Sequence, residues 1–184
     1  MRKGYENNLW KGMAAGVVGG LVASWTMNQF QALWSKLAEG SERSHGAQSM
    51  QRGSPPQPSP AKNDEEQDDA TERVASAISE TVLDRELTKS EKEKAGAVVH
   101  YGFGTTTAAI YGAAAELAPG VTVCNGLAFG AAVWLVADEA IVPALGLSKP
   151  PTEYPLSIHV YSLSSHLVYG LTAEIVRRAT RHVL

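Results

Sequence analysis

The stretch "TVCNGLAFGAAVWLVADEAIVPAL", residues 122–145, decides what kind of fold this chain has. It is about as long as a helix that crosses a bilayer, yet it carries two adjacent carboxylates, Asp138 and Glu139. Between Ala95 and Leu145 the only other formal charge is Glu116. Helices of a water-soluble bundle need a charged outer face. The near absence of charged residues in this region therefore favours a membrane-embedded fold over a soluble bundle.

Three other segments resemble the first in length and apolar character, namely residues 9–37, 95–117 and 155–178. Pro119-Gly120 and Lys149-Pro150-Pro151 separate the later segments, because such sequences interrupt helices. For residues 9–37 a signal peptide is the alternative, since Arg2, Lys3 and Lys11 precede a short apolar stretch. The segment continues amphipathically through Trp34 without a clean cleavage site, which favours a transmembrane helix.

Residues 40–94 differ sharply in composition from the rest of the chain and carry half of its basic residues. The proline cluster "PPQPSP" and the acidic run after it cannot bury enough apolar area to fold alone. Further on, apolar residues recur at helical spacing among charges, at Val74, Ile78, Val82 and Leu87. This spacing is typical of an amphipathic helix.

Together these segments predict an all-α fold, a four-helix transmembrane bundle with a long disordered polar loop and an amphipathic helix before the second span. The predicted regions are an N-terminal transmembrane helix (1–38), a disordered Pro/acidic linker (39–68), an amphipathic helix (69–94) and a three-helix transmembrane core (95–184).

Small residues repeat every four positions in three of the apolar segments. They are Gly12, Gly16 and Gly20, then Gly104, Ala108 and Gly112, then Gly126 and Gly130. Such spacing lets membrane helices approach closely, although glycine is also simply frequent in membrane helices. Three independent repeats favour helix packing, either within one chain or between copies.

Positively charged residues flank the first and last predicted spans, and this predicts that both termini are cytoplasmic. They are Arg2, Lys3 and Lys11 at one end and Arg177, Arg178 and Arg181 at the other. The long loop is then extracytoplasmic. The formal net charge of −3 gives no reason to expect a nucleic-acid partner. The expected partners are the lipid bilayer and either a membrane protein or a second copy of the chain.

Ionisable residues inside membrane spans usually face the interior of a bundle. His100, Asp138, His159 and His166 fall in the same half of the bilayer when depth is counted along each predicted helix. His159, Ser162 and His166 share one helix face. Asp138 and Glu139 differ by about 100° in direction, so we expect Asp138 to point inward and Glu139 to point sideways.

Three interpretations of this polar cluster stay open. The side chains could form a structural hydrogen-bonded network, a proton or cation relay, or a transition-metal site. A metal site is the least supported of the three, because no closely spaced histidine pair is present. At the opposite end, Glu116 and Glu174 lie near Arg177 and Arg178, which predicts ion pairing at the membrane interface.

A family resemblance is carried by His100, Glu116 within "IYGAAAE", then "VPALGLSKPP" and "SSHLVYGLTAEIVRR". These motifs resemble the YagU-like family of bacterial inner-membrane proteins, a family of unknown function. In the last motif His166, Glu174, Arg177 and Arg178 fit the spacing. The resemblance implies location in the inner membrane and a helical fold, but no chemistry.

The sequence shows no arrangement typical of an enzyme. Ser165 and His166 are adjacent, and adjacent residues of a helix point apart. "GFGTTTAAIYG" lacks the lysine of a phosphate-binding loop. The single cysteine, Cys124, excludes an internal disulfide and a multi-cysteine metal site. We therefore expect no cofactor and no enzymatic activity, but a packing or accessory subunit of a membrane assembly. A proton or cation conduit or sensor is the alternative.

Overall fold

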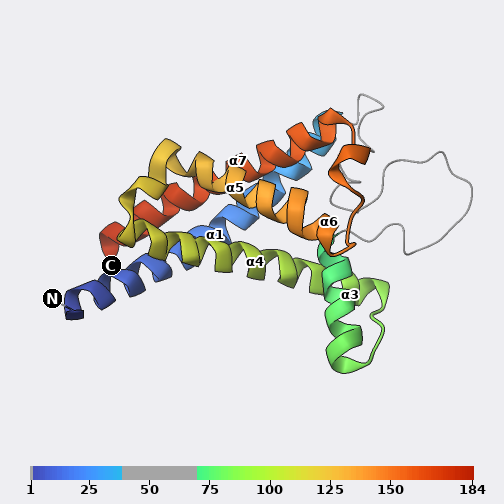
Figure 1. The fold of residues 1–184 in the computed structure, drawn as a ribbon, viewed down its shortest axis with the longest axis horizontal. Helices are drawn as coiled ribbons and strands as arrows, with labels where there is room; N and C mark the ends of the chain where they lie inside the picture. The colour runs from blue at the N-terminus through green and yellow to red at the C-terminus, as the bar shows by residue number, and fades with distance from the viewer. Residues whose placement is uncertain (1, 39–69) are drawn as a thin grey trace, which may run out of the picture. The chain divides into compact units, whose positions relative to one another are not determined.

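The computed structural model describes residues 2–38 and 70–184, and every regular element within these ranges is helical (Figure 1). The predicted all-α class is thus confirmed for the described part of the chain. The linker predicted for residues 39–68 lies outside it.

Five helices account for most of the described chain: α1 (Arg2–Ala38), α3 (Ala70–Leu83), α4 (Lys89–Leu117), α5 (Leu127–Val136) and α7 (Leu156–Val183). The connections contain four shorter elements, which are η2 (Pro119–Gly126), a π-helix η3 (Ala137–Ile141), α6 (Val142–Ala144) and η4 (Pro151–Glu153).

The chain divides into two compact units, each assembled from distant segments. Unit 1 comprises Met1–Ala32, Tyr101–Trp134 and Leu163–Leu184, and unit 2 comprises Leu33–His100 and Leu135–Ser162. Unit 1 therefore contains most of α1, α4, α5 and α7. Unit 2 contains α3, the π-helix and the connection that leads into α7.

The interior of unit 1 is made of small and polar side chains, whereas its outer surface is made of large apolar ones. Its core cluster consists of Ala23, Met27, Ala108, Tyr169 and Ala173, with Phe129 and Val133 packed against it. Ser24, Ser165 and Glu174 are fully buried. Large side chains are exposed instead, among them Trp10, Leu21, Trp25, Ile110 and Ile175. A protein folded in water buries its large aliphatic residues preferentially, so unit 1 shows the reverse distribution.

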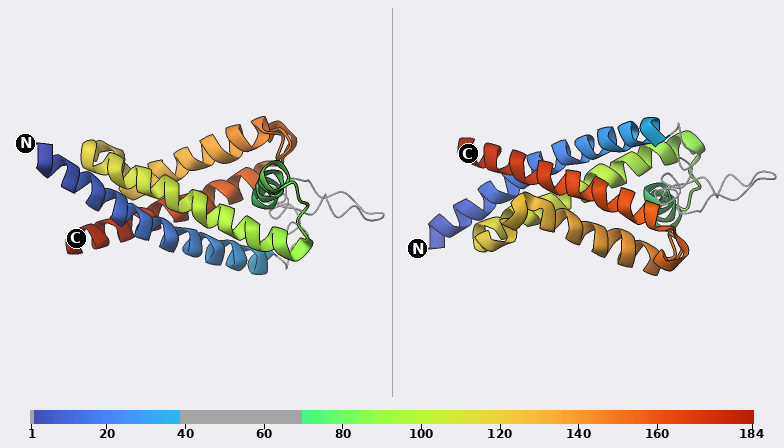
Figure 2. Two further views of the ribbon diagram at one scale, coloured as in Figure 1. Left: turned by 90° about the horizontal axis from the view of Figure 1, so that it is seen from below. Right: turned by 90° about the horizontal axis from the view of Figure 1, so that it is seen from above.

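Glycines on α1 face the backbone of α4 at three successive turns. A Cβ added at Gly12 would overlap the carbonyl oxygen of Gly112, and one at Gly16 would overlap that of Ala108. Gly20 lies in the same way against Gly104 and Ala108. Both views of Figure 2 show α1 and α4 side by side in unit 1. The two backbones are therefore in direct contact.

A second close contact joins α5 to α7. A Cβ at Gly130 would overlap the carbonyl oxygen of His166, and one at Gly170 would overlap that of Gly126. Each of these helices thus has a glycine where the other helix comes nearest.

One of the described helices, Pro119–Ala144, is long and apolar enough by length and composition to cross a membrane. The sequence predicted four such spans. In α1, α4 and α7 the faces that contact other helices are rich in glycine, alanine, serine, threonine and tyrosine, and these residues lower the average apolar character of the whole helix. One candidate span is weak support for a membrane location.

In unit 2 the amphipathic segment is not a single helix over residues 69–94, as the sequence suggested. Helix α3 ends at Leu83, where Asp84 takes a left-handed conformation (φ 50°). Helix α4 begins at Lys89, after the five residues 84–88. The backbone N–H of Thr88 donates to Glu91 Oε2 at 2.9 Å, and the Thr88 hydroxyl donates to the same oxygen at 2.8 Å. Arg85 also pairs with Glu91. The Glu91 side chain thus accepts from the Thr88 N–H, as in the capping box of a Thr-x-x-Glu sequence, while the Glu91 N–H donates to the Thr88 carbonyl at 2.9 Å.

We expect the first turn of α4 to loosen at low pH. The backbone N–H of Thr88, followed by the Arg85 guanidinium and the Thr88 hydroxyl, lowers the pKa of Glu91 from 4.5 to about 2. A carboxylate with a lowered pKa stabilises the folded state above its unfolded pKa, and this stabilisation disappears as the pH falls from about 4.5 through about 2. The protection factors of the Glu91 and Lys92 amides, which correct for the pH dependence of intrinsic exchange, should fall over this window in the wild type. In Glu91→Gln they should be low and independent of pH.

We expect Gly112→Ala to destabilise the fold by about 1–3 kcal/mol, because the added methyl group overlaps the Gly12 backbone. Gly102→Ala is the matched control on the same helix, since a Cβ there meets no atom within 4 Å. It should be neutral or stabilising by up to about 1 kcal/mol. Unfolding in detergent measures both changes, and equal effects at the two positions would show that the close contact does not matter.

Candidate functional site

The two acids of the apolar helix lie in a π-helical turn, Ala137–Ile141, between α5 and α6. Pro143 explains this turn, because proline has no N–H to donate to the carbonyl of Glu139 and its ring would clash with that carbonyl in an α-helix. The N–H of Val142 donates instead to the carbonyl of Ala137, five residues earlier. The wider turn changes the directions of the side chains within it. π-Turns of this kind are frequent at functional sites.

Both acids contact α7 within unit 2. Ser162 Oγ donates to Asp138 Oδ2 at 2.6 Å. Glu139 Oε1 lies 2.7 Å from His159 Nδ1, and the other ring nitrogen, Nε2, lies 3.0 Å from the carbonyl oxygen of Pro151. The Glu139 side chain is 11% exposed and that of His159 is 20% exposed. We call Asp138, Glu139, His159 and Ser162 the α7 polar group.

The prediction that Glu139 points sideways was wrong. Ideal α-helical geometry placed Asp138 inward and Glu139 sideways. In the structure Glu139 pairs with His159 and Asp138 with Ser162. The π-turn explains the difference, because an extra residue per turn rotates the side chains relative to an α-helix.

Of the four residues of the predicted cluster, His159 and Asp138 belong to the α7 polar group. His100 belongs to the same unit. His166 belongs to unit 1, where it is buried and its carbonyl lies against Gly130. In the described ranges no three histidine, cysteine or acidic side chains converge so as to hold a metal ion.

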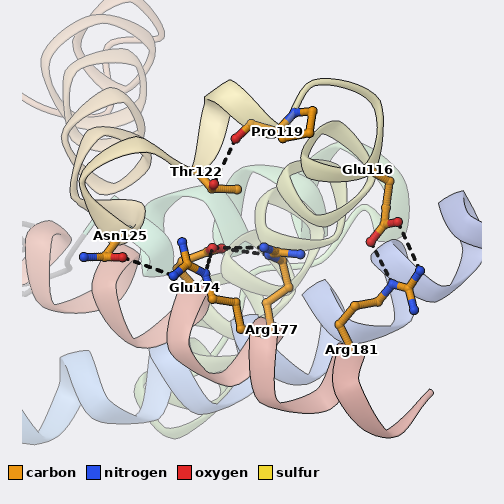
Figure 3. A network of polar contacts seen from close by, with 8 residues as sticks. Glu116, Pro119, Thr122, Asn125, Glu174, Arg177 and Arg181 are labelled. Atoms are coloured by element: carbon orange, nitrogen blue, oxygen red, sulfur yellow. Dashed lines mark hydrogen bonds and ion pairs between the residues drawn. The ribbon is translucent and has the colours of Figure 1, made fainter.

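A second polar group lies at one end of unit 1, and its centre is the fully buried carboxylate of Glu174. Arg177 donates to both of its oxygens, from Nε at 2.7 Å and from a terminal nitrogen at 2.9 Å. Arg178 donates to the same carboxylate and also to Asn125 Oδ1, the latter at 3.2 Å. Figure 3 shows Glu174 between Arg177 and Asn125. Two-pronged pairing of this kind is the strong form of a charged hydrogen bond.

The turn formed by the last three residues of η2 places Asn125 against this group. Cys124, Asn125 and Gly126 follow one another with positive φ angles of 56°, 53° and 85°. A side chain at Gly126 would overlap the Gly170 carbonyl, so a glycine is needed both for the backbone conformation and for the contact. The turn brings the start of α5 onto α7 beside Glu174.

Aromatic rings extend the same group to α4 and α5. The Arg177 guanidinium carbon lies 5.9 Å from the centre of the Tyr111 ring, within range of a cation–π contact. Tyr111 in turn stacks on Phe129 with a centroid distance of 4.1 Å. Three helices are therefore joined around one buried ion pair.

Glu116 pairs with Arg181 and not with Arg177 or Arg178, a partner that the ion-pair prediction missed. The two distances are 2.8 and 3.2 Å, and Arg181 also donates to Asn8 on α1. Arg181 follows Glu174 by seven residues and so shares its helix face, a signal that could have identified it. Lys11 Nζ donates to the Leu184 carbonyl at 2.6 Å. The described charged side chains of unit 1 all belong to this end, where both chain ends also lie (Figure 2).

A family model matches residues 54–175, which is about two thirds of the chain. The chain belongs to the family described as "Protein of unknown function (DUF1440)". Membership of a family of unknown function, which the sequence motifs implied, is thereby confirmed. No curated protein and no solved structure matches the chain. The family adds no chemistry to what the side chains show.

We expect Glu174→Gln to destabilise the protein by about 3–5 kcal/mol, because it leaves the buried Arg177 without a carboxylate. Glu80→Gln on α3 is the control, since Glu80 is exposed and surface substitutions usually stay within about 0.5 kcal/mol. Unfolding of both variants in the same detergent gives the comparison. A cost for Glu174→Gln as small as that of the control would mean that the ion pair does not hold the helices together.

Proposed function

We propose that this chain is an integral membrane protein that acts by association and not by catalysis. One observation carries the proposal, namely the inverted distribution of side chains in unit 1. Ala23, Ser24 and Ala173 are buried while Trp10, Trp25 and Ile110 are exposed. Exposed apolar surface of this extent is costly in water and is favourable in lipid.

Helix contacts in unit 1 support the same setting. Lipid tails are as apolar as leucine, so membrane helices associate through close backbone packing and buried polar contacts. The glycines of α1 and α4 and the pair of Glu174 with Arg177 provide these two features. The described charged side chains of unit 1 gather at one end, and the rest of the unit carries none, which fits an interface between lipid and water.

The finer proposal is a four-span protein of the bacterial inner (plasma) membrane, as the YagU-like resemblance implies. Its spans are the apolar parts of α1, α4, the Pro119–Ala144 helix and α7. The basic end of unit 1 lies at the cytoplasmic face, because positively charged residues are enriched there. Both termini are then cytoplasmic, and the connection that holds η4 lies on the other side.

The accessory role rests on how the polar side chains are used. Glu174, Glu116 and Asp138 each bind a side chain of another helix or of the next turn. These groups connect helices, which is a structural use. The exposed apolar residues of α1, with Trp10 and Trp25 among them, are available to lipid, to a membrane-protein partner or to a second copy.

Cys124 tests the topology, because it is the chain's one cysteine and its side chain is exposed. In right-side-out spheroplasts we expect a membrane-impermeant maleimide to label Cys124 only after lysis. In a Cys124→Ser background, Thr152→Cys in η4 is the matched control and should be labelled without lysis, since Thr152 is exposed. Labelling of both positions from the same side would contradict the four-span arrangement.

A second candidate function is a proton or cation conduit or sensor, and the α7 polar group favours it. Asp138, Glu139 and His159 lie together on the apolar helix and α7. Ionisable groups at such positions often mark proton or ion pathways.

As a conduit, purified protein in vesicles should dissipate a proton gradient, and Asp138→Asn should abolish this flux. His166→Gln in unit 1 is the comparison that tests whether the whole predicted cluster takes part. A flux equal to that of protein-free vesicles, or one unchanged by Asp138→Asn, removes the conduit form of this candidate.

A further inference from the structure

Both ring nitrogens of His159 face groups that can accept a hydrogen bond. Nε2 lies 3.0 Å from the carbonyl oxygen of Pro151, and Nδ1 lies 2.7 Å from a carboxyl oxygen of Glu139. A backbone carbonyl has no proton to donate. The hydrogen of the His159–Pro151 bond therefore resides on Nε2. This assignment decides which protons Nδ1 and Glu139 must carry.

The second contact needs a proton of its own. With Nε2 already protonated, a neutral imidazole has only a lone pair at Nδ1, which would face a carboxylate that also has only lone pairs. One more proton must lie between Nδ1 and Glu139, and it makes the pair imidazolium with carboxylate, because imidazole is ordinarily a stronger base than a carboxylate. The pair then has no net charge, which suits its low exposure.

We propose that Glu139 and His159 form a proton-binding site, and that its proton holds the segment around Pro151 onto α7. This inference deepens the sensor form of the second candidate function and rests on it. The ligand is a single proton taken from solvent. It binds between His159 Nδ1 and Glu139 Oε1, and no other bond forms or breaks.

Loss of this proton would break one of the two contacts. A neutral imidazole has one N–H, so it can donate to Glu139 or to Pro151 but not to both. If the N–H moves to Nδ1, the Pro151 carbonyl loses its histidine donor. If it stays on Nε2, the ring faces an unscreened carboxylate. Either way, deprotonation loosens the link between η4 and the two helices.

The hydrogen bonds within this segment close its own short turn, and its Tyr154 side chain is buried. The N–H groups of Glu153 and Tyr154 donate to the carbonyls of Pro150 and Pro151 at 3.0 and 3.2 Å, and the N–H of Lys149 donates to the Tyr154 hydroxyl at 3.2 Å. The Tyr154 ring meets the His159 ring edge-on, with centroids 6.5 Å apart. The His159–Pro151 bond thus joins this short turn to α7.

Other titratable groups surround the pair and must be separated from it in any test. Asp138 precedes Glu139 but is engaged by Ser162. Around Tyr154 lie Glu153 and Lys149 of the same turn and Arg73 of α3. Burial raises the pKa of Tyr154, so its hydroxyl stays protonated through neutral pH. It does not supply the proton of the pair.

The test is a pH titration of the full-length protein in lipid nanodiscs with ¹⁵N-labelled histidine, in which His159→Gln identifies the His159 signals. At low pH we expect both ring nitrogens of His159 to carry a proton. As the pH rises one of them should lose it, and amide exchange of residues 149–154 should increase at the same midpoint. A ring that keeps one protonated nitrogen across the whole accessible pH range would overturn the proposal.

Glu139→Gln removes the carboxylate but keeps the shape of the side chain. We expect it to weaken proton binding at His159 by at least about tenfold, because an adjacent negative charge favours the charged imidazole. The exchange midpoint of residues 149–154 should move with it. Glu153→Gln is the matched control, an exposed acid of the same turn, and should leave both midpoints unchanged. Equal shifts in the two variants would contradict the assignment.

If Glu139→Gln fails to fold, the wild-type protein alone tests the proposal. The midpoint of the His159 titration and that of amide exchange at residues 149–154 should coincide, and different midpoints would contradict it. The result is also distinct from that of the membrane proposal. A protein whose Cys124 labelling contradicts the four-span topology can still show the His159 titration. Conversely, correct labelling together with a His159 that never binds the second proton would refute only the proton site.

Discussion

Contact between helix backbones is the constraint on which the rest of unit 1 depends. Gly12 and Gly16 bring α1 onto α4, and Gly130 and Gly170 bring α5 onto α7, so closely that a single methyl group would overlap a carbonyl. Between surfaces so near, the interior holds mostly alanine, serine and tyrosine side chains, together with Met27, and most large aliphatic side chains point outward. The inverted distribution of side chains is thus a consequence of the packing. This distribution is stable in surroundings that are as apolar as those side chains, as lipid tails are.

Polar groups in such an interior have to find partners inside the protein, because an unpaired buried charge costs several kcal/mol. The two polar groups satisfy this requirement in different ways. Glu174 is surrounded by Arg177, Arg178 and the Tyr111 ring, and its charge is fully compensated. Glu139 and His159 instead form the proposed site for a single proton that exchanges with solvent. The first group is suited to stability and the second to a response to pH.

Several of these features could be read from the sequence because they depend on local composition. Four long helical segments, the spacing of the glycines and the proximity of Glu174 to Arg177 follow from helical periodicity alone. The partner of Glu139 could not be read in this way, since the ideal α-helix places it wrongly and Pro143 changes the local turn. The break at Asp84 depends on a left-handed residue, although Thr88 and Glu91 carried a capping signal. The pairing of Glu116 with Arg181 depends on the packing of α4 against α7.

The central claim is that the exposed apolar faces of unit 1 contact lipid. Spin labels at Leu21, Ile110 and Ile175, placed singly in a Cys124→Ser background, test it most directly because one exposed residue is sampled on each of three helices. In reconstituted vesicles all three labels should collide more often with oxygen, which concentrates in lipid, than with a water-soluble nickel complex. Labels that collide mainly with the nickel complex would contradict the account.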